Sequence, residues 1–273
     1  MPFQNLMSDP AGFFISLLLR LPALLIAIVL HEAAHAYAAY RLGDDTAMSL
    51  GRLTLNPLRH FDPIGTFMLI FVGFGWARPV PINPRNFKKP RRDDLIVSIA
   101  GIATNLILFI LSGLMMYSFI MSAFARAPSM GISFHLNEIE SLFKIAPFQY
   151  TFYSFPARGE ITSSLAQELI APVFGGTMGH LYTIIANITL VNLMLAVFNL
   201  IPAPPLDGFH VVNSLFFKGP LFAGRRLEQA GQVVLFALLF SGYLSTGLNY
   251  VATGAFELLG KGYFAVFRAL GLG

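Results

Sequence analysis

Long apolar stretches separated by short polar ones run along most of the chain. Three of them, at about 13–41, 95–121 and 181–200, are long enough to cross a lipid bilayer, because a spanning helix needs about 20 predominantly apolar residues. Residues 233–251 are predicted to form a fourth span. Residues 252–273 place three charged side chains among aromatic ones and suit an interfacial amphipathic helix better. The pattern predicts an all-α polytopic membrane protein with about four to five transmembrane helices.

Prolines mark the places where helices cannot continue. In 76–84 they alternate, which excludes a helix or a central strand but permits a short edge β-strand or a plain extended loop. The apolar stretch 64–74 is too short to span and fits a re-entrant or interfacial hairpin. Three prolines within 202–205 must break the third core helix, predicted over 181–217. Irregular backbone at that depth must be buried in protein or line a cavity.

Composition supports a membrane-embedded chain. Of the 273 residues, 55% are hydrophobic and 12% charged, and the mean hydropathy is +0.66; soluble domains have about 25% charged residues. The net charge is +4, and no basic surface interleaved with aromatic residues indicates nucleic-acid binding. We expect 1–273 to form one domain, with C-terminal helices within 231–273. No cysteine is present, so a metal would need His, Asp or Glu ligands.

The distribution of charge predicts an orientation. Nine of the eighteen basic residues lie between 41 and 92, which places this part on the cytoplasmic side by the positive-inside rule. The polar segment 123–178 has three basic and four acidic residues and is expected on the extracytoplasmic side. The first twelve residues contain no Lys or Arg, so a signal peptide is not expected. We therefore expect a multi-pass protein of the cell (inner) membrane.

The most informative motif is His31-Glu32-Ala33-Ala34-His35 in the first apolar stretch. Two imidazoles four residues apart share one helix face and can bind one zinc ion, and Glu32 can then take a proton from zinc-bound water. Ionisable residues in a membrane helix are costly and indicate a functional site, although a polar cluster bonded to neighbouring helices is the alternative. His35 lies six residues before Arg41, so the zinc would lie roughly 9 Å inside the helix end, near the cytoplasmic face.

A catalytic zinc takes three protein ligands and keeps a fourth position open. The third ligand could be His60, Asp62 or Asp93, which flank the basic loop and are expected to be solvated. It could be His180, which lies toward the opposite face. It could also be Asp207 or His210, which follow the broken helix on the zinc side. For Asp207, an ion pair with an arginine such as Arg52 or Arg78 is the alternative. We predict Asp207 as the ligand.

The second core helix carries small residues and one amide near its start, from Gly101 to Asn105. Small residues let helices approach closely, and an asparagine in a membrane helix needs a hydrogen-bond partner. A donor near developing oxyanion charge can assist catalysis. Ordinary helix packing is the competing interpretation of Asn105.

Together these motifs resemble the site-2 protease family of intramembrane zinc metalloproteases. The resemblance is carried by His31–His35, Gly101–Asn105 and Asn199–Gly208 with its Leu-Asp-Gly, in this order and at membrane depth. The stretches 51–57 and 75–84 are similar to the small bacterial branch.

The resemblance covers about residues 24–120 and 180–215, with no sign of a PDZ or CBS domain. Two positions depart from the family pattern. Ile102 stands where a proline is common, and Phe209 where glycine or serine is common. Neither departure removes a ligand.

By this resemblance, His31, His35 and Asp207 bind Zn²⁺, Glu32 is the general base and Asn105 assists near the reacting carbonyl. The implied activity is hydrolysis of peptide bonds within or near transmembrane segments of membrane-protein substrates. A membrane metal-binding or metal-transport protein could use the same cluster, but transport needs ligands along a path to both faces. A di-iron membrane hydroxylase or desaturase would need many more than the six histidines present.

Overall fold

The computed structural model describes residues 7–71, 75–131, 171–217 and 225–269. Most of the segment 123–178, which we expect on the extracytoplasmic side, lies outside the described residues.

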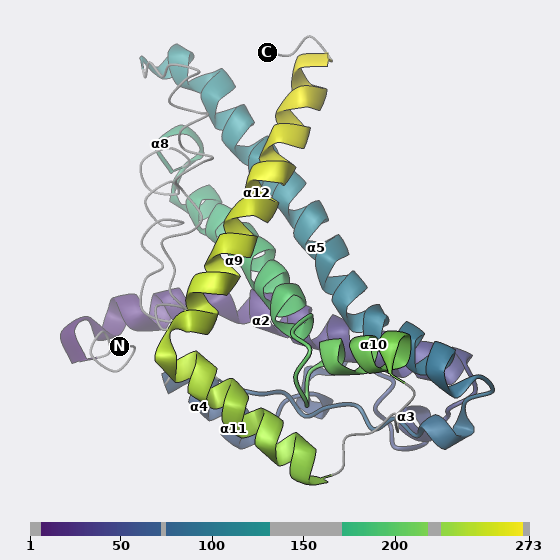
Figure 1. Ribbon diagram of the computed structural model, residues 1–273. Coiled ribbons are helices and arrows are strands. Elements are labelled where there is room, and N and C mark those ends of the chain that lie inside the picture. Colours follow the sequence, from purple (N-terminus) through teal and green to yellow (C-terminus); the bar gives the residue numbers. More distant parts are fainter. Residues whose placement is uncertain (1–6, 72–74, 132–170, 218–224, 270–273) are drawn as a thin grey trace.

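Three long helices pack against one another and form the frame of the molecule (Figure 1). They are α2 (Pro10–Arg41), α5 (Pro90–Arg126) and α9 (Gly176–Asn199). Each is long and apolar enough, by length and composition, to cross a membrane. The helices predicted for the first, second and third core segments are therefore confirmed.

Local sequence explains where α2 begins and ends. The carboxylate of Asp9 accepts a hydrogen bond from the Gly12 amide at 3.0 Å, and Pro10 occupies the first turn, where its missing N–H is not needed. The helix is capped at Leu42, and Gly43 then adopts a φ of +106°, a left-handed conformation that glycine reaches without a Cβ penalty. The histidine motif therefore lies near the C-terminal end of one long helix.

The largest buried apolar cluster lies between α5 and α9, with α12 (Tyr243–Ala269) against them. Tyr117 from α5, Tyr182 from α9 and Phe256 from α12 are almost entirely buried in it. The Tyr117 hydroxyl donates a hydrogen bond to the Phe256 carbonyl at 3.2 Å, so the phenol of this apolar core has a partner. This core fixes α5 and α9 relative to each other.

Short helical elements and irregular backbone connect α2 to α5. They are α3 (Thr46–Ser49), η1 (Pro57–Arg59), α4 (Pro63–Phe71) and η2 (Pro84–Asn86). With nine residues, α4 is too short to span a bilayer, as expected for the apolar stretch 64–74.

Within 76–84, residues 76–83 are extended but form no β-strand, and Pro84 begins η2. In the described part of the chain their pairing is limited to an isolated antiparallel bridge between Phe61 and Ala77. The predicted short β-strand is therefore wrong, and the extended loop is the conformation that forms. The ladder does not continue because Pro79 and Pro81 have no N–H to donate.

The third core helix is broken, as predicted. α9 ends at Asn199, and α10 (Asp207–Phe216) begins after an irregular stretch with three prolines. A Cβ on Gly208, in the first turn of α10, would lie 2.4 Å from the Leu200 carbonyl oxygen. Because glycine has no Cβ, the chain can fold back this tightly. The first residue of α10, Asp207, thereby comes beside α2.

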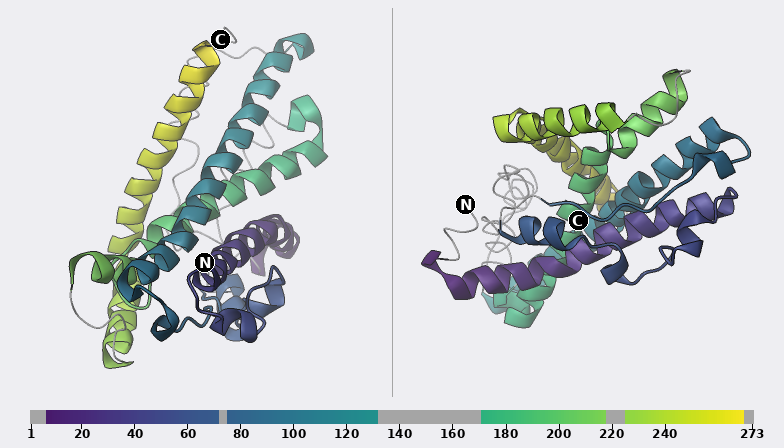
Figure 2. Two further views of the ribbon diagram at one scale, coloured as in Figure 1. Left: turned by 90° about the vertical axis from the view of Figure 1, so that its right-hand side faces the viewer. Right: turned by 90° about the horizontal axis from the view of Figure 1, so that it is seen from below.

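The C-terminal part forms two helices, α11 (Arg225–Ser241) and α12. They meet at Gly242, whose φ of +79° is a left-handed conformation that ends a helix. The predicted continuous span over 233–251 is therefore wrong. Residues 252–269 continue α12 instead of starting a separate helix, and α12 runs alongside α5 and α9 (Figures 1 and 2).

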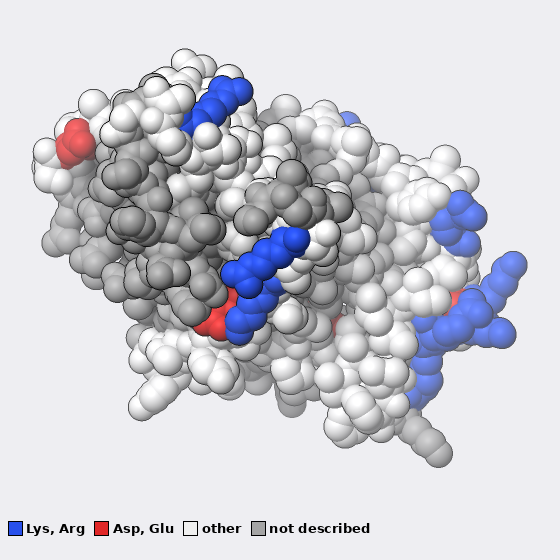
Figure 3. All heavy atoms as spheres, turned by 90° about the horizontal axis from the view of Figure 1, so that it is seen from above, with Lys and Arg blue, Asp and Glu red and all other residues white. Residues whose placement is uncertain are grey.

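Basic side chains are concentrated at one end of the molecule. On the face drawn in Figure 3, the largest group of Lys and Arg lies at the right-hand end, where α2 finishes and α5 begins in Figure 1. This agrees with the high density of basic residues between positions 41 and 92 in the sequence.

Candidate metal centre

Three side chains from two separate parts of the chain converge between α2 and α10. The Nε2 atoms of His31 and His35 lie 3.0 Å apart, on the same face of α2. Oδ2 of Asp207 lies 3.3 Å from the first of these nitrogens and 3.2 Å from the second. Both imidazoles are buried and the carboxylate is largely buried. The three potential ligand atoms lie within 4.8 Å of one another, which one metal ion can bridge.

Each imidazole is oriented by a hydrogen bond at its other nitrogen. Nδ1 of His31 lies 2.6 Å from Oδ1 of Asn105, and Nδ1 of His35 lies 2.8 Å from the carbonyl oxygen of Val97, both on α5. A carbonyl oxygen can only accept, so both Nδ1 atoms donate and both Nε2 atoms present lone pairs. This is the arrangement in which metal-binding histidines are found.

The donor set fits zinc. With Nδ1 protonated in both rings, the two Nε2 atoms and Oδ2 of Asp207 are three buried acceptors with no donor among them, and Oδ2 has no hydrogen-bond partner. Such a group is costly without a cation. A Cβ on Gly101 would lie 2.4 Å from Nε2 of His35, so the absence of a side chain there leaves the nitrogen accessible. Two imidazoles and one carboxylate suit Zn²⁺.

Asn105 is fully buried and links the three long helices. Its Nδ2 donates to the carbonyl oxygen of Ala27 on α2 at 3.2 Å and to Oδ1 of Asn192 on α9 at 2.8 Å. The amide of Asn192 in turn donates to the Ile188 carbonyl at 2.8 Å. Both N–H groups of Asn105 are therefore occupied, and its oxygen faces His31. Sequence reasoning missed Asn192, although an asparagine in an apolar helix was a usable signal.

Glu32 is buried beside the cluster but does not belong to it. Oε2 of Glu32 accepts a hydrogen bond from the backbone N–H of Val80 at 2.9 Å. Val80 lies in the extended stretch 76–84, so this stretch contacts the carboxylate directly. The sequence did not predict this contact.

The other candidate ligands lie apart from the cluster. His60 and Asp93 are almost completely buried, so the expectation that they are solvated is wrong. The reason is that each is bonded locally. His60 donates from Nε2 to the Thr54 carbonyl at 2.8 Å, and Asp93 accepts from the Lys89 amide at 2.9 Å.

The remaining three candidates also have other surroundings. Asp62 is partly buried and accepts from the Gly65 amide at 2.8 Å at the start of α4. His180 is exposed near the start of α9. Nδ1 of His210, on α10, lies 3.5 Å from Oδ2 of Asp94. Among the described ionisable residues, the cluster that could hold a metal is the one with Asp207.

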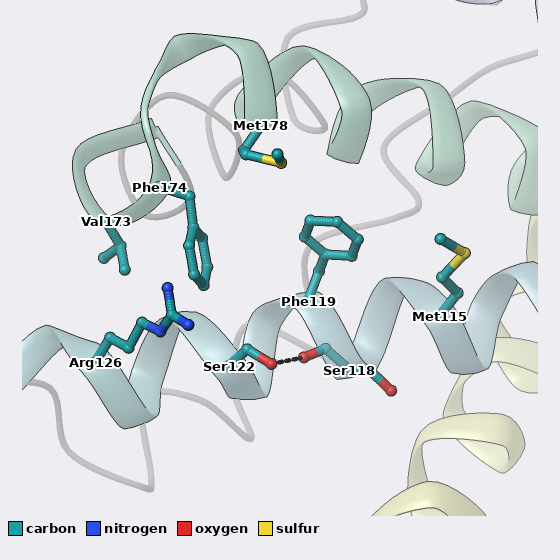
Figure 4. Close-up of a pocket in the computed structure, with 8 residues that line it drawn as sticks. All are labelled: Met115, Ser118, Phe119, Ser122, Arg126, Val173, Phe174 and Met178. Atoms are coloured by element: carbon teal, nitrogen blue, oxygen red, sulfur yellow. Dashed lines mark hydrogen bonds between the residues drawn. The ribbon is translucent and has the colours of Figure 1, made fainter.

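A hollow of about 600 Å³ lies near the far end of α5, away from the metal centre (Figure 4). Its lining includes Met115, Phe119 and Met178, and the guanidinium of Arg126 lies 4.9 Å from the centroid of the Phe174 ring. No His, Asp or Glu is among its described lining residues. The described lining therefore offers no metal ligand and no general base for this chemistry.

Comparison with known proteins agrees with this geometry. A family model described as peptidase family M50 matches residues 20–242. The Bacillus subtilis (strain 168) protein named "Putative zinc metalloprotease YwhC" is 34% identical over 247 residues, which cover 90% of this chain and 91% of that protein. The Mycolicibacterium smegmatis protein named "Putative zinc metalloprotease Rip2" is 37% identical over 92 residues, covering 32% of this chain and 35% of its own length. No solved structure matches the chain.

The family match covers most of the chain and includes the histidine motif, the second core helix and the broken helix. The apolar helices and the family agree on a multi-pass membrane protein. The chain is therefore a zinc metalloendopeptidase and belongs to peptidase family M50, the site-2 protease family of intramembrane zinc metalloproteases.

Proposed function

We propose that His31, His35 and Asp207 are the zinc ligands and that Glu32 is the general base. The observation that carries this assignment is the convergence of three buried acceptor atoms, with no donor among them, on one point beside Glu32. A metal-transport role has less support, because no second ligand cluster is found among the described residues that would continue a path to the other face.

Zinc in this centre supplies Lewis-acid polarisation of a peptide carbonyl and favours deprotonation of water at neutral pH. The work of Glu32 is to take the proton of the attacking water and to give it to the leaving amine. The Val80 N–H that donates to Oε2 fixes where this carboxylate lies. Because this hydrogen bond engages Oε2, Oε1 of Glu32 remains available for the proton transfer.

Asn105 acts through His31 in this proposal. The sequence suggested a donor near the reacting carbonyl, but both N–H groups of the side chain are engaged by Ala27 and Asn192. Its oxygen holds the His31 ring in the orientation that presents Nε2. A ligand-orienting hydrogen bond of this kind is typically worth 10- to 100-fold in metal affinity or activity.

The proposed substrate is a membrane-protein segment within or near a transmembrane helix, unwound so that its backbone is reachable. We propose that it adds as a strand to 76–83 through main-chain hydrogen bonds. In extended backbone, alternate residues direct N–H and C=O to the same edge. Val80 and Ile82 share an edge, and the carbonyl of Val80 and both backbone groups of Ile82 have no partner among the described residues.

The proposed setting is the cell (inner) membrane, with the active site near the cytoplasmic face and 123–178 on the other side. The support is the basic segment 41–92, which begins six residues after His35, together with the group of Lys and Arg at the right-hand end of Figure 3. We also propose that 1–273 acts as one domain, because α2, α5 and α10 jointly build the centre.

Glu32→Gln tests the assignment. The amide is nearly isosteric but cannot take a proton, so we expect cleavage of a reconstituted single-span substrate to fall by at least about 100-fold, with zinc retained. Zinc per chain and cleavage rate are measured on the same purified sample. Glu257→Gln, at a partly exposed carboxylate on α12 that pairs with Lys261, is the matched control and should cleave normally. Full activity of Glu32→Gln would rule out the general-base role, and zinc loss would make Glu32 a ligand.

A further inference from the structure

Asp44 is a buried carboxylate outside the metal centre, in the loop that follows α2. It has no exposed surface and accepts four hydrogen bonds. Oδ1 accepts from the amide and hydroxyl of Thr46, at 3.1 and 2.5 Å, and from the Asn86 side chain at 2.8 Å. Oδ2 accepts from the backbone N–H of Asn83 at 2.7 Å. A buried charge needs such partners, and these four hydrogen bonds fix the position of the Asp44 carboxylate.

The carboxylate is in its charged form at neutral pH. Burial by itself would raise the pKa of Asp44, but the hydrogen bonds from Thr46, Asn83 and Asn86 outweigh burial and hold the pKa below its usual value. The charged oxygen therefore binds the Asn83 amide more strongly than a neutral acceptor would.

The bond to Asn83 fixes one end of the extended stretch 77–83. The other end is fixed at Arg78, whose N–H donates to the His60 carbonyl at 2.8 Å and whose carbonyl accepts from the Arg52 guanidinium at 2.6 Å. The stretch is therefore attached to the rest of the protein at both ends.

Val80 lies between these two attachments. Its N–H donates to Oε2 of Glu32, and its buried side chain packs with Ala36 of α2 and Ala47 of α3. Because Pro79 and Pro81 have no N–H, the stretch has few backbone donors of its own with which to hold its place. The hydrogen bonds at Arg78 and Asn83 therefore determine the position of the Val80 amide.

We propose that Asp44 is a positioning residue for catalysis: it fixes the stretch 77–83 so that the Val80 N–H holds the Glu32 carboxylate beside the metal centre. This rests on the proposed function, in which Glu32 is the general base. The competing explanation is that Asp44 only stabilises its loop. The two explanations make different predictions. If Asp44 positions the stretch, a substitution of Asp44 must change the local structure at Val80 through Asn83.

Asp44→Asn isolates the relevant bond. The amide oxygen can replace Oδ1 toward Thr46 and Asn86, but the NH₂ group then faces the Asn83 N–H, donor against donor. We expect kcat/KM for a reconstituted single-span substrate to fall about tenfold, as for a buried donor left without its acceptor, with zinc per chain unchanged. The matched control is Asp45→Asn, which makes the same charge change at an exposed neighbour whose side chain makes no capping bond.

A second readout follows the stretch itself. The chain has no cysteine, so Val80→Cys introduces a single thiol at a buried position without removing the backbone N–H. We expect N-ethylmaleimide to label this thiol several-fold faster in the full-length Asp44→Asn protein than in the Asp45→Asn protein. Ala123→Cys, a fully buried position in α5, reports general loosening and should label equally slowly in both backgrounds.

The proposal requires both changes together: lower kcat/KM and faster labelling at position 80 alone. It is overturned if labelling at position 80 is unchanged, if labelling rises equally at position 123, or if cleavage stays within twofold of the Asp45→Asn control. Absence of cleavage by the unsubstituted protein would count against the proposed function instead. The labelling comparison would then still decide whether Asp44 fixes the stretch.

Discussion

At the scale of single residues, the centre depends on which atom each histidine offers. The spacing of His31 and His35 shows that they share a helix face, but it does not show which ring nitrogen is free. Asn105 and the Val97 carbonyl decide this, because each accepts a hydrogen bond from Nδ1. Gly101 then leaves the space in front of Nε2 open. The orientation of both imidazoles is thus set by residues of α5 that are not among the proposed ligands.

Asp207→Ala is expected to release zinc and stop cleavage. The reason is that Asp207 is the proposed third ligand, and two imidazoles alone do not complete a catalytic site. Zinc per chain and cleavage of a single-span substrate are measured on purified protein. Asp62→Ala, which removes a carboxylate that caps α4 and lies outside the cluster, should keep its zinc. One zinc per chain in folded Asp207→Ala would place the third ligand elsewhere, with His210 as the next candidate.

Among the described residues, no arginine forms an ion pair with Asp207, contrary to the alternative considered for this residue. The described ionisable side chains that contact the Asp207 carboxylate are those of His31 and His35. Arg52 donates instead to the backbone carbonyl of Arg78. The carboxylate therefore lies against the two histidines and not against a guanidinium.

At the scale of elements, the broken helix and the extended stretch determine how the active site is built. The prolines after α9 stop the helix, and Gly208 lets α10 begin close to the end of α9. The prolines within 76–84 prevent a regular strand but leave one edge with backbone groups that no described residue pairs with. Such an edge can accept a peptide strand.

Crosslinking should locate the substrate on this stretch. With a photoreactive residue in place of Trp76, which is 45% exposed, or Ile82, a single-span substrate held by the Glu32→Gln protein should be captured. The same probe in place of Met115, exposed in the hollow at the far end of α5, is the control and should capture less. Capture at Met115 alone would contradict strand addition and would indicate that substrate docks against α5 and α9.

At the scale of the whole molecule, the metal centre lies toward the basic end. α2, α5 and α10 meet there, while the apolar core of α5, α9 and α12 extends away from it (Figures 1 and 2). Half of the basic residues lie between Arg41, the last residue of α2, and Arg92, in the first turn of α5. This asymmetry predicts an active site near the cytoplasmic face.

Single cysteines should report this orientation. Lys88 and Ser129 are exposed and lie before and after the apolar part of α5. In intact cells, a membrane-impermeant maleimide should label Ser129→Cys but not Lys88→Cys, and both should react after lysis. The natural absence of cysteine removes background labelling. Labelling of Lys88→Cys in intact cells would reverse the orientation and place the centre near the outer face.

The sequence by itself predicted the features that follow from local rules. Apolar length identified α2, α5 and α9, the prolines at 202–205 predicted the broken helix, and the His31–His35 spacing predicted a shared metal-binding face. Local rules also produced the errors. A continuous span over 233–251 was predicted because hydropathy does not register the left-handed turn at Gly242. The prolines in 76–84 permitted a short strand or an extended loop. The strand does not form, because extended backbone also needs a partner with which to pair.

The tertiary structure decided everything that depends on contacts between distant parts of the chain. Asn105 lies 74 residues from the histidine that it orients, and Val80 lies 48 residues from Glu32. Asp207 comes from a different helix than the two imidazoles. Hydrophobic periodicity determines which face of a helix is buried, but not which polar group it meets there. Those partners are selected by the packing of α2, α5, α9 and α10, because a buried donor or acceptor must be satisfied within the fold.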